Sequence, residues 1–328
     1  MSYKVLSLVA RGSFGECYKV EKDGQILCQK NVDLCNPKVD NEDIKNELSF
    51  LGKLEHQNII KLHSYELGKD MMLSFFTELC YCSLENLRTI YDKKEFMRNR
   101  ISIKTGCAVG YQILNALNYI HNLNPKIVHL DLKDTNVLIT ETGIVKLIDF
   151  GLAMELDSND LVTDETMRGT HEYASPEVRE KEHYGTPSDI WSFGIMMYEL
   201  FFGVIPRPER ESYERRNKEV FDKMDLQDNL RDSFNYLFGS IFQFEPSKRP
   251  SVSKLLKYKY FTLKQSEAQE RIVEEIKLLE KLLEIRKKFT EDIKSAGSLS
   301  ILSLEESSDE SSSDEESDDG SDDEGSDK

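Results

Sequence analysis

Features that would place the chain in a membrane or in an oxidising compartment are missing from its sequence. No apolar run approaches the ~18 residues that a membrane-spanning helix needs, and no apolar stretch at the amino terminus resembles a signal peptide. The six cysteines form no C-x-x-C pair and have no histidines at zinc spacing, and Cys80 and Cys82 form only C-x-C. We therefore expect a cytoplasmic or nuclear location and no membrane partner.

A strong basic patch is also missing, because the charge of the chain is unevenly distributed. The formal net charge is −17 over 328 residues, but residues 305–328 hold 13 acidic residues and one lysine, a net of −12, which leaves −5 for the rest. We expect no specific nucleic-acid partner. Residues 297–328 are rich in serine and acid and poor in apolar side chains, which predicts a disordered acidic tail.

The rest of the chain is long enough for one two-lobed domain with a helical extension. Hydrophobic residues make up 39% of the sequence and charged residues 31%, which suits a folded domain of about 260 residues. Residues 262–296 form the predicted extension, and from 264 to 294 they contain helix formers with no glycine or proline. Apolar residues form two stripes on it: Ile272, Ile276, Leu279 and Leu283, and Leu278, Leu282, Ile285 and Phe289. Two alternatives stay open, a helix packed on the domain or a partner or dimer helix at 264–294.

Two strands joined by a tight turn are predicted near the centre of the chain. Residues 137–139 and 144–148 are apolar, and Thr142–Gly143 between them is typical of a hairpin turn. Polar residues stand just before and just after this hairpin. We therefore expect the side chains that precede it to lie close to Asp149, which follows it.

The side chains that this hairpin brings together have the chemistry that phosphoryl transfer needs. Asn136 and Asp149 supply oxygen ligands of the kind that Mg²⁺ prefers. Asp131 can accept or orient the proton of an attacking hydroxyl, and Lys133 can reach the phosphate in transfer. The reaction needs metal ligands, charge neutralisation and a carboxylate at the nucleophile, with little covalent chemistry by the protein.

The order and spacing of these residues point to a family. H-x-D-x-K-x-x-N over 129–136, followed by D-F-G at 149–151, resembles the catalytic centre of a eukaryotic protein kinase of the serine/threonine type. The resemblance implies an α+β, two-lobed protein kinase fold, with ATP and Mg²⁺ as cofactors and proteins as substrates. Its implied boundaries are a kinase domain over 1–261, with a small β-rich N-lobe of about 1–79, a hinge at 78–82 and a larger helical C-lobe of 83–261.

The amino-terminal residues resemble the ATP-binding half of such a kinase. Lys4–Val20 reads as strand, turn, strand, and the glycines of its turn let backbone N–H groups approach phosphate oxygens. The pattern is similar to the kinase loop G-x-G-x-x-G-x-V, except that Ala10 and Cys17 replace its first glycine and its valine. The resemblance implies these ATP-binding residues: Ala10, Arg11, Gly12, Ser13, Phe14, Gly15, Cys17, Cys28, Lys30, Glu47, Thr77, Glu78, Cys80 and Leu138.

Some of these residues have a specific expected role. Lys30 stands at the kinase A-x-K position, and because a buried lysine needs a carboxylate, we expect an ion pair with Glu47 on a helix over 41–54. The backbone of Glu78–Cys80 is expected to bind adenine, with Thr77 at the back of the pocket.

The resemblance also implies an activation segment over Asp149–Glu177. Thr166 and Thr170 lie towards its end, and Thr166 stands where many kinases are phosphorylated. Glu177 is expected to form an ion pair with Arg249, which matches a kinase arginine in the sequence PSKRP.

Three further matches concern how the catalytic loop is supported. Leu130 stands where most kinases have an arginine that binds a phosphate on the activation segment, so we expect weak dependence on that phosphorylation. Asp189 is expected to brace the backbone of the catalytic loop. An internal apolar stack is expected from Leu51, Leu62, His129 and Phe150.

Two cysteines replace apolar residues that flank adenine in similar kinases. Cys17 and Cys28 are expected on adjacent antiparallel strands with their side chains on the same face. The plain interpretation is apolar packing. The alternative is a regulatory disulfide across the roof of the ATP site, which requires a Cα separation of ~4.4–6.8 Å. An apolar pocket is expected to keep both thiols protonated.

The sequence therefore predicts a serine/threonine protein kinase, with Asp131, Lys133 and Asn136 as catalytic residues and Asn136 and Asp149 as metal ligands. One alternative is a pseudokinase scaffold, although no chemical residue of the motifs is lost. Another is a binding module in which the acidic tail captures basic partners, and this could coexist with catalysis.

Overall fold

The computed structural model describes residues 3–12, 15–92, 101–162, 167–203 and 228–278, and residues 280, 281 and 284. Ser13, Phe14, Thr166 and the acidic tail lie outside these ranges. The chain divides into two compact units, Met1–Lys277 and Leu278–Lys328, and all elements below belong to the first. No helix within the described ranges is long and apolar enough to cross a membrane.

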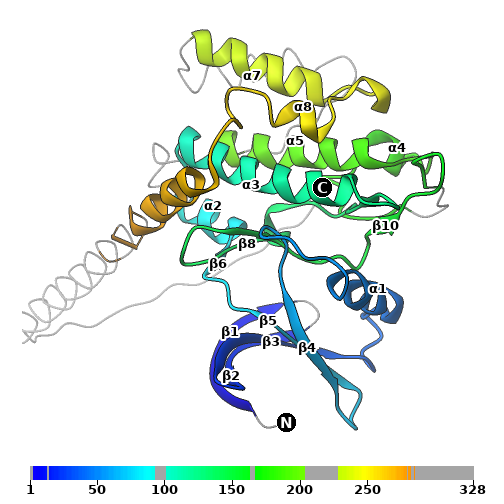
Figure 1. Ribbon diagram of the computed structural model, residues 1–328, viewed down its shortest axis with the longest axis vertical. Coiled ribbons are helices and arrows are strands. Elements are labelled where there is room, and N and C mark those ends of the chain that lie inside the picture. The colour runs from blue at the N-terminus through cyan, green and yellow to red at the C-terminus, as the bar shows by residue number, and fades with distance from the viewer. Residues whose placement is uncertain are drawn as a thin grey trace, which may run out of the picture. The chain divides into compact units, whose positions relative to one another are not determined.

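The amino-terminal lobe is an antiparallel sheet in the order β1-β2-β3-β5-β4 (Figure 1). Its strands are β1 (Tyr3–Gly12), β2 (Gly15–Lys22), β3 (Gln25–Asp33), β4 (Leu62–Leu67) and β5 (Met72–Glu78). Gly15 has a φ of 158°, and a Cβ there would lie 1.7 Å from the carbonyl oxygen of Asn31, so only glycine fits the start of β2. The two predicted strands are confirmed, whereas Ser13 and Phe14 of the turn between them lie outside the described residues.

A single helix, α1 (Asn41–Leu51), accompanies this sheet. Asp40 caps its amino terminus by accepting a hydrogen bond from the amide of Glu42. The helix was predicted to continue to Leu54, but its α-helical residues end at Leu51 and a turn through Gly52 follows. Ile44 and Leu48 pack against the core of the sheet, which brings Glu47 of the same helix towards β3.

The carboxyl-terminal lobe is mainly helical. Its helices are α2 (Leu84–Asp92), α3 (Ile103–His121), α4 (Pro176–Arg179), α5 (Thr186–Phe202), α7 (Asp228–Ile241) and α8 (Val252–Leu255). α3 and α5 lie side by side through this lobe (Figure 1). The described residues thus confirm the two-lobed α+β fold.

Aromatic packing between α5 and α7 forms a large part of this lobe's core. The ring of Tyr198 lies 4.5 Å from that of Phe202 and 5.1 Å from that of Phe238, centroid to centroid, in edge-to-face geometry. Trp191 is also fully buried and contacts Phe242 edge to face. This packing fixes α5, whose first turn reaches the catalytic loop.

Short strands carry the loops between the lobes. They are β6 (Cys82–Ser83), β7 (Ile127–Val128), β8 (Val137–Ile139), β9 (Val145–Leu147) and β10 (Met154–Glu155). A 3₁₀ turn, η2 (Asp134–Asn136), precedes β8, and a second 3₁₀ turn, η3 (Pro246–Lys248), follows α7. β8 pairs with β9 in the predicted hairpin. The amide of Ile148 donates to the carbonyl of Asn136 at 3.0 Å, so the two ends of the hairpin lie side by side.

Residues 265–277 form a further helix, which packs on the domain. Ala268 and Ile272 are completely buried, and Ile276 is 6% exposed. The side chain of Glu275 accepts a hydrogen bond from the Thr105 hydroxyl of α3 at 2.7 Å. This part of the extension therefore follows the packed-helix alternative, whereas the residues beyond 284 lie outside the described ranges.

The packing of this helix predicts that it stabilises the whole domain. Ile272→Ala removes a fully buried side chain, which typically costs about 2–5 kcal/mol, and should lower Tm by at least about 4 °C. Glu274→Ala, on the exposed side of the same helix, is the matched control and should leave Tm unchanged within about 2 °C. Calorimetry of both variants tests this, and equal Tm values would contradict it.

Candidate active site

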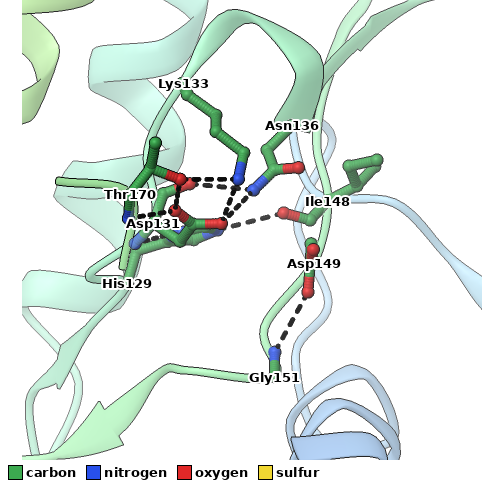
Figure 2. Close-up of polar contacts among 8 residues, drawn as sticks. All are labelled: His129, Asp131, Lys133, Asn136, Ile148, Asp149, Gly151 and Thr170. Carbon is green, nitrogen blue, oxygen red and sulfur yellow. Dashed lines mark hydrogen bonds and ion pairs between the residues drawn. The ribbon is translucent and has the colours of Figure 1, made fainter. Parts of the chain in front are cut away.

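The carboxylate of Asp131 is the centre of a dense polar cluster (Figure 2). One oxygen accepts from the amide and hydroxyl of Thr170, at 3.0 and 2.7 Å. The other accepts from the ammonium of Lys133 at 2.7 Å and from the amide nitrogen of Asn136 at 2.9 Å. Lys133 also donates to the Thr170 hydroxyl at 2.8 Å. The loop therefore brings together all three predicted catalytic residues and adds Thr170.

This environment keeps Asp131 ionised. Burial alone would raise the pKa of Asp131, but the hydrogen bond and charge of Lys133 and the hydrogen bond from Thr170 outweigh burial and hold it below its usual range. An ionised carboxylate can accept or orient a hydroxyl proton without first losing its own.

Asn136 and Asp149 lie at opposite ends of the hairpin, where the amide of Ile148 donates to the carbonyl of Asn136. Because the Asn136 amide nitrogen is used on Asp131, its amide oxygen lies on the other side, towards the segment that carries Asp149 (Figure 2). Asp149 makes one long hydrogen bond, from the amide of Gly151 at 3.4 Å, and its φ of 64° lies in the left-handed region. An amide oxygen and a carboxylate in this arrangement fit a divalent cation shared with phosphates.

The predicted ion pair between Lys30 and Glu47 is present, with a nitrogen–oxygen distance of 3.3 Å. Burial would lower the pKa of Lys30, but Glu47 and Asp149 outweigh it and raise that pKa. Burial raises the pKa of Glu47, with Asp149 adding to the effect and Lys30 opposing it. Lys30 is thus a charged group held on β3, close to Asp149.

The other predicted nucleotide-binding residues line the sheet and the segment after it. Ala10 lies opposite Cys17, and Arg11 forms an exposed ion pair with Glu16. Thr77 lies opposite Cys28 on β5, and Leu138 lies on β8 opposite Ser83. All of these belong to the described part of the sheet and hairpin.

The hinge prediction needs one refinement at Glu78. Its amide donates to the carbonyl of Lys61 at 3.3 Å, and its carboxylate pairs with Lys146 at 2.7 Å. Within the described ranges, no hydrogen bond engages the amide of Cys80. Of these two amides, that of Cys80 is therefore the one open to a ligand, and Glu78 joins the two lobes through its side chain.

The strand register favours the apolar-packing interpretation of Cys17 and Cys28 over the alternative of a disulfide. Cys17 pairs with Lys30, and Cys28 pairs with Lys19, so the two cysteines are diagonal neighbours. Diagonal neighbours have Cα atoms about 7–8 Å apart, which exceeds the range that a disulfide spans, and both thiols are free. The expectation that both stay protonated holds only for Cys28, whose pKa is raised, whereas that of Cys17 is lowered to about 7.

A buried carboxylate on α5, that of Asp189, binds the backbone of the catalytic loop. Asp189, which has no exposed surface, accepts from the amides of His129 and Leu130, both at 2.9 Å, and from His121 at 2.7 Å. Leu130 has a φ of 67°, a region that non-glycine residues rarely adopt. The predicted brace is confirmed, and it compensates for the cost of this conformation.

The predicted pair that closes the activation segment is also present. Arg249 donates to both oxygens of Glu177 at 2.6 and 2.7 Å, and Ser188 donates to the same carboxylate. Burial would raise the pKa of Glu177, but the bonds and charge of Arg249 lower it. Both side chains of the pair are almost fully buried, so the segment is fixed at this end.

The predicted apolar stack is supported in part. His129 is fully buried and lies 4.8 Å from Phe150, centroid to centroid. Its Nε2 faces the carbonyl of Ile148 at 3.0 Å, so Nε2 carries the proton and the ring has a packing role. Leu51 is buried, while Leu62 packs with the sheet core around Phe75.

A comparison with protein families bears directly on this site. The model of the protein kinase domain matches residues 3–261. The chain belongs to the protein kinase family. The matched residues include every site residue described above and end before the helix at 265–277.

Individual relatives share the kinase domain at moderate identity. A probable serine/threonine-protein kinase, mkcF of Dictyostelium discoideum, is 31% identical over 81% of this chain and 37% of its own length. The serine/threonine-protein kinase TIO of Arabidopsis thaliana is 29% identical over 82% of this chain and 20% of its own. Mitogen-activated protein kinase kinase kinase 3 of the same plant is 28% identical over 77% of this chain and 44% of its own length. The aligned part of this chain thus corresponds to less than half of each of these relatives.

Sequence reasoning missed one residue that positions the kinase activation segment. The Asn46 side chain on α1 donates to the carbonyls of Gly151 and Ala153 at 2.7 and 2.8 Å, and to that of Phe150 at 3.4 Å. It thereby ties the helix that carries Glu47 to the residues after Asp149. No motif marks a lone asparagine on a helix, so only the fold reveals this contact.

Because Asp189 braces the catalytic loop, we expect the Asp189→Asn variant to have a lower free energy of unfolding than the wild type. The neutral amide cannot accept the same three hydrogen bonds. We therefore expect the free energy of unfolding to fall by an amount on the order of 3 kcal/mol at pH 7. Burial alone would raise the pKa of Asp189, but His121 and the hydrogen bond from the amide of His129 hold this pKa below its usual value. Its contribution is therefore fully present above the unfolded pKa of ~3.9 and is lost as the pH falls further.

Urea unfolding at pH 7 and at several lower pH values measures this difference. The exposed pair of Asp160 with Lys126 supplies the control, because Asp160→Asn should change the free energy of unfolding by about 1 kcal/mol or less. A difference between wild type and Asp189→Asn that stays constant down to the acid limit would count against the proposed role of the charge.

Proposed function

We propose that this chain is an ATP-dependent serine/threonine protein kinase. The observation that carries the proposal is the Asp131 carboxylate, ionised and oriented by Lys133, Thr170 and Asn136. Along the chain it is followed by Asn136 and Asp149, the two proposed oxygen ligands for a metal. The family match and the serine/threonine kinase names of the relatives support this class.

Each residue has a role in the proposed transfer. Asp131 accepts or orients the proton of the substrate hydroxyl, and Lys133 neutralises charge on the phosphoryl group in transfer. Lys30, held by Glu47, binds the α- and β-phosphates of ATP. A divalent cation, for which we propose Mg²⁺, would be held by Asn136 and Asp149 and would supply charge neutralisation at the phosphates.

The adenine would bind between the sheet and β8. The amide of Cys80 supplies a hydrogen-bond donor at the pocket edge. Thr77 lies at its back, on the strand paired with the one that carries Cys28. Leu138 forms the floor, and Ala10 and Cys17 belong to the roof. The glycine loop through Gly12 and Gly15 would place backbone N–H groups on phosphate oxygens.

A pseudokinase scaffold is the alternative function, although the described site retains the ion pair of Lys30 and the polar cluster at Asp131. The acidic residues 297–328 would bind basic partners, which a pull-down with this segment alone tests. Residues 285–294, after the packed helix, could still serve a partner or dimer, and a cytoplasmic or nuclear location remains expected.

The activity itself is tested by phosphate incorporation. The protein should transfer the γ-phosphoryl group of labelled ATP to a generic protein mixture in the presence of Mg²⁺. Asp149→Asn should abolish transfer, because it removes a proposed metal ligand. Equal incorporation by both proteins, or none by the wild type with folded protein, would favour the scaffold alternative.

Lys30→Met should abolish transfer while leaving the fold intact. Glu47 already has a raised pKa, so it can take up a proton when its partner is lost, and the cost should be about 1 kcal/mol or less. Lys22→Met is the matched control, since Lys22 is a buried lysine of the same sheet that pairs with Glu66, away from Asp149. This control should still transfer phosphate. Global unfolding of Lys30→Met would show that the pair is structural.

The surroundings of Leu130 support independence from activation-segment phosphorylation. Leu130 is buried in an apolar cluster with residues on both sides of the gap at 163–166: Val128, Leu156, Val162, Ala174, Val178 and Tyr184, with Met154 and Met167 packed against it. An arginine at this position would offer a phosphate two charged hydrogen bonds. Apolar packing holds the segment here without a phosphate.

We therefore expect Thr166→Ala to retain nearly full activity. Thr170→Val should instead lose about tenfold or more, because the Thr170 hydroxyl bonds to Asp131 and Lys133. Initial rates of the two variants on one protein substrate, at equal concentrations of folded protein, give the comparison. A hundredfold loss in Thr166→Ala would refute phosphorylation independence.

A further inference from the structure

Two thiols and an ammonium group lie together on the underside of the sheet. In the pairing of β2 with β3, Cys17 lies directly opposite Lys30, and Cys28 is the diagonal neighbour of Cys17. Because side chains on a strand alternate between faces, all three lie on the face from which Lys30 reaches Glu47. Each of the three is partly exposed.

The neighbours of Cys17 favour its thiolate. A hydrogen bond from Cys28 lowers the pKa of Cys17, and the charge of Lys30 adds to this, while burial and the more distant Glu47 oppose it; the result is a pKa of about 7. On the other side, β1 places the uncharged Ala10 opposite Cys17. The same hydrogen bond and burial raise the pKa of Cys28, which therefore retains the shared proton.

We propose that Cys17 is a covalent modification site for soft alkylating electrophiles that enter the nucleotide pocket. Cys28 acts as the proton-retaining donor and Lys30 as the neighbouring cation that together keep Cys17 nucleophilic. With iodoacetamide, the Cys17 sulfur forms a bond to the methylene carbon, the carbon–iodine bond breaks, and iodide leaves with its electron pair. The product is a thioether, and the step needs neither oxidant nor reductant.

The strand register explains why the pair supports alkylation in place of a disulfide. A diagonal separation of about 7–8 Å lets the thiols exchange a hydrogen bond but does not bring the sulfurs to bonding geometry without backbone movement. An adduct on Cys17 would occupy the roof over Lys30. Loss of ATP binding on modification follows from this, and that part rests on the proposed function.

The test measures the rate of carbamidomethylation at each cysteine by peptide mass spectrometry. Intact protein is treated with limiting iodoacetamide between pH 5.5 and 9, and the exposed Cys35 serves as internal reference. Cys17 should reach half its maximal rate near pH 7, as its pKa indicates, and at pH 7 should react faster than Cys35. Cys17→Val should remove this fast reaction.

Two substitutions of Cys28 test whether its role towards Cys17 is hydrogen-bond donation or packing. Cys28→Ala removes the donor and should move the midpoint of the Cys17 profile up by about one pH unit. Cys28→Ser keeps a hydroxyl donor and should leave the midpoint close to the wild-type value. A Cys17 rate below that of Cys35 at pH 7, or a midpoint that Cys28→Ala does not move, would overturn the proposal.

A binding measurement keeps this inference distinct from the proposed function. A fluorescent ATP analogue with Mg²⁺ should bind the untreated protein, slow the labelling of Cys17 several-fold, and no longer bind after alkylation. If the untreated protein binds no nucleotide, the proposed kinase function fails, while the pH profiles still decide the reactivity of Cys17. If nucleotide binds but the Cys17 profile is ordinary, only the modification site is refuted.

Discussion

The structure depends most on the buried carboxylate of Asp189. It accepts the amides of two consecutive residues, His129 and Leu130, and so holds a backbone conformation that a leucine would otherwise avoid. The residue that follows is Asp131. Because α5 is fixed by the aromatic packing of the carboxyl-terminal lobe, the position of the catalytic carboxylate is set by that core.

Charged groups near the site are buried in partnered sets. Asp131 has four donors, Glu177 has Arg249 and Ser188, and Lys30 has Glu47. Burial raises the pKa of a lone carboxylate, and at Asp131 and Glu177 the partners reverse that effect. Removing the partners of Asp131 or Glu177 would leave an unpaired buried charge, whereas Glu47, whose pKa is raised, can take up a proton when Lys30 is lost.

The activation segment is held by contacts of two kinds. The Asn46 side chain donates to the carbonyls of Phe150, Gly151 and Ala153 near the start of the segment, which couples the segment to the helix that carries Glu47. Further along, Leu130 packs with apolar residues of the segment in one buried cluster.

Much of this protein could be predicted from local sequence. The hairpin of β8 and β9, the strands of the sheet and the pairs Lys30–Glu47 and Glu177–Arg249 follow from periodicity, turn residues and motif spacing, because those signals are short-range or tied to a known family pattern. The tertiary structure alone decided what depends on register and on distant packing. The register of β2 and β3 makes Cys17 and Cys28 diagonal neighbours and places Lys30 directly opposite Cys17, where the sequence also allowed a disulfide. The helix at 265–277 became part of the core because Ala268 and Ile272 are buried against the domain and Glu275 accepts from the Thr105 hydroxyl of α3, which no pattern within the helix itself can show.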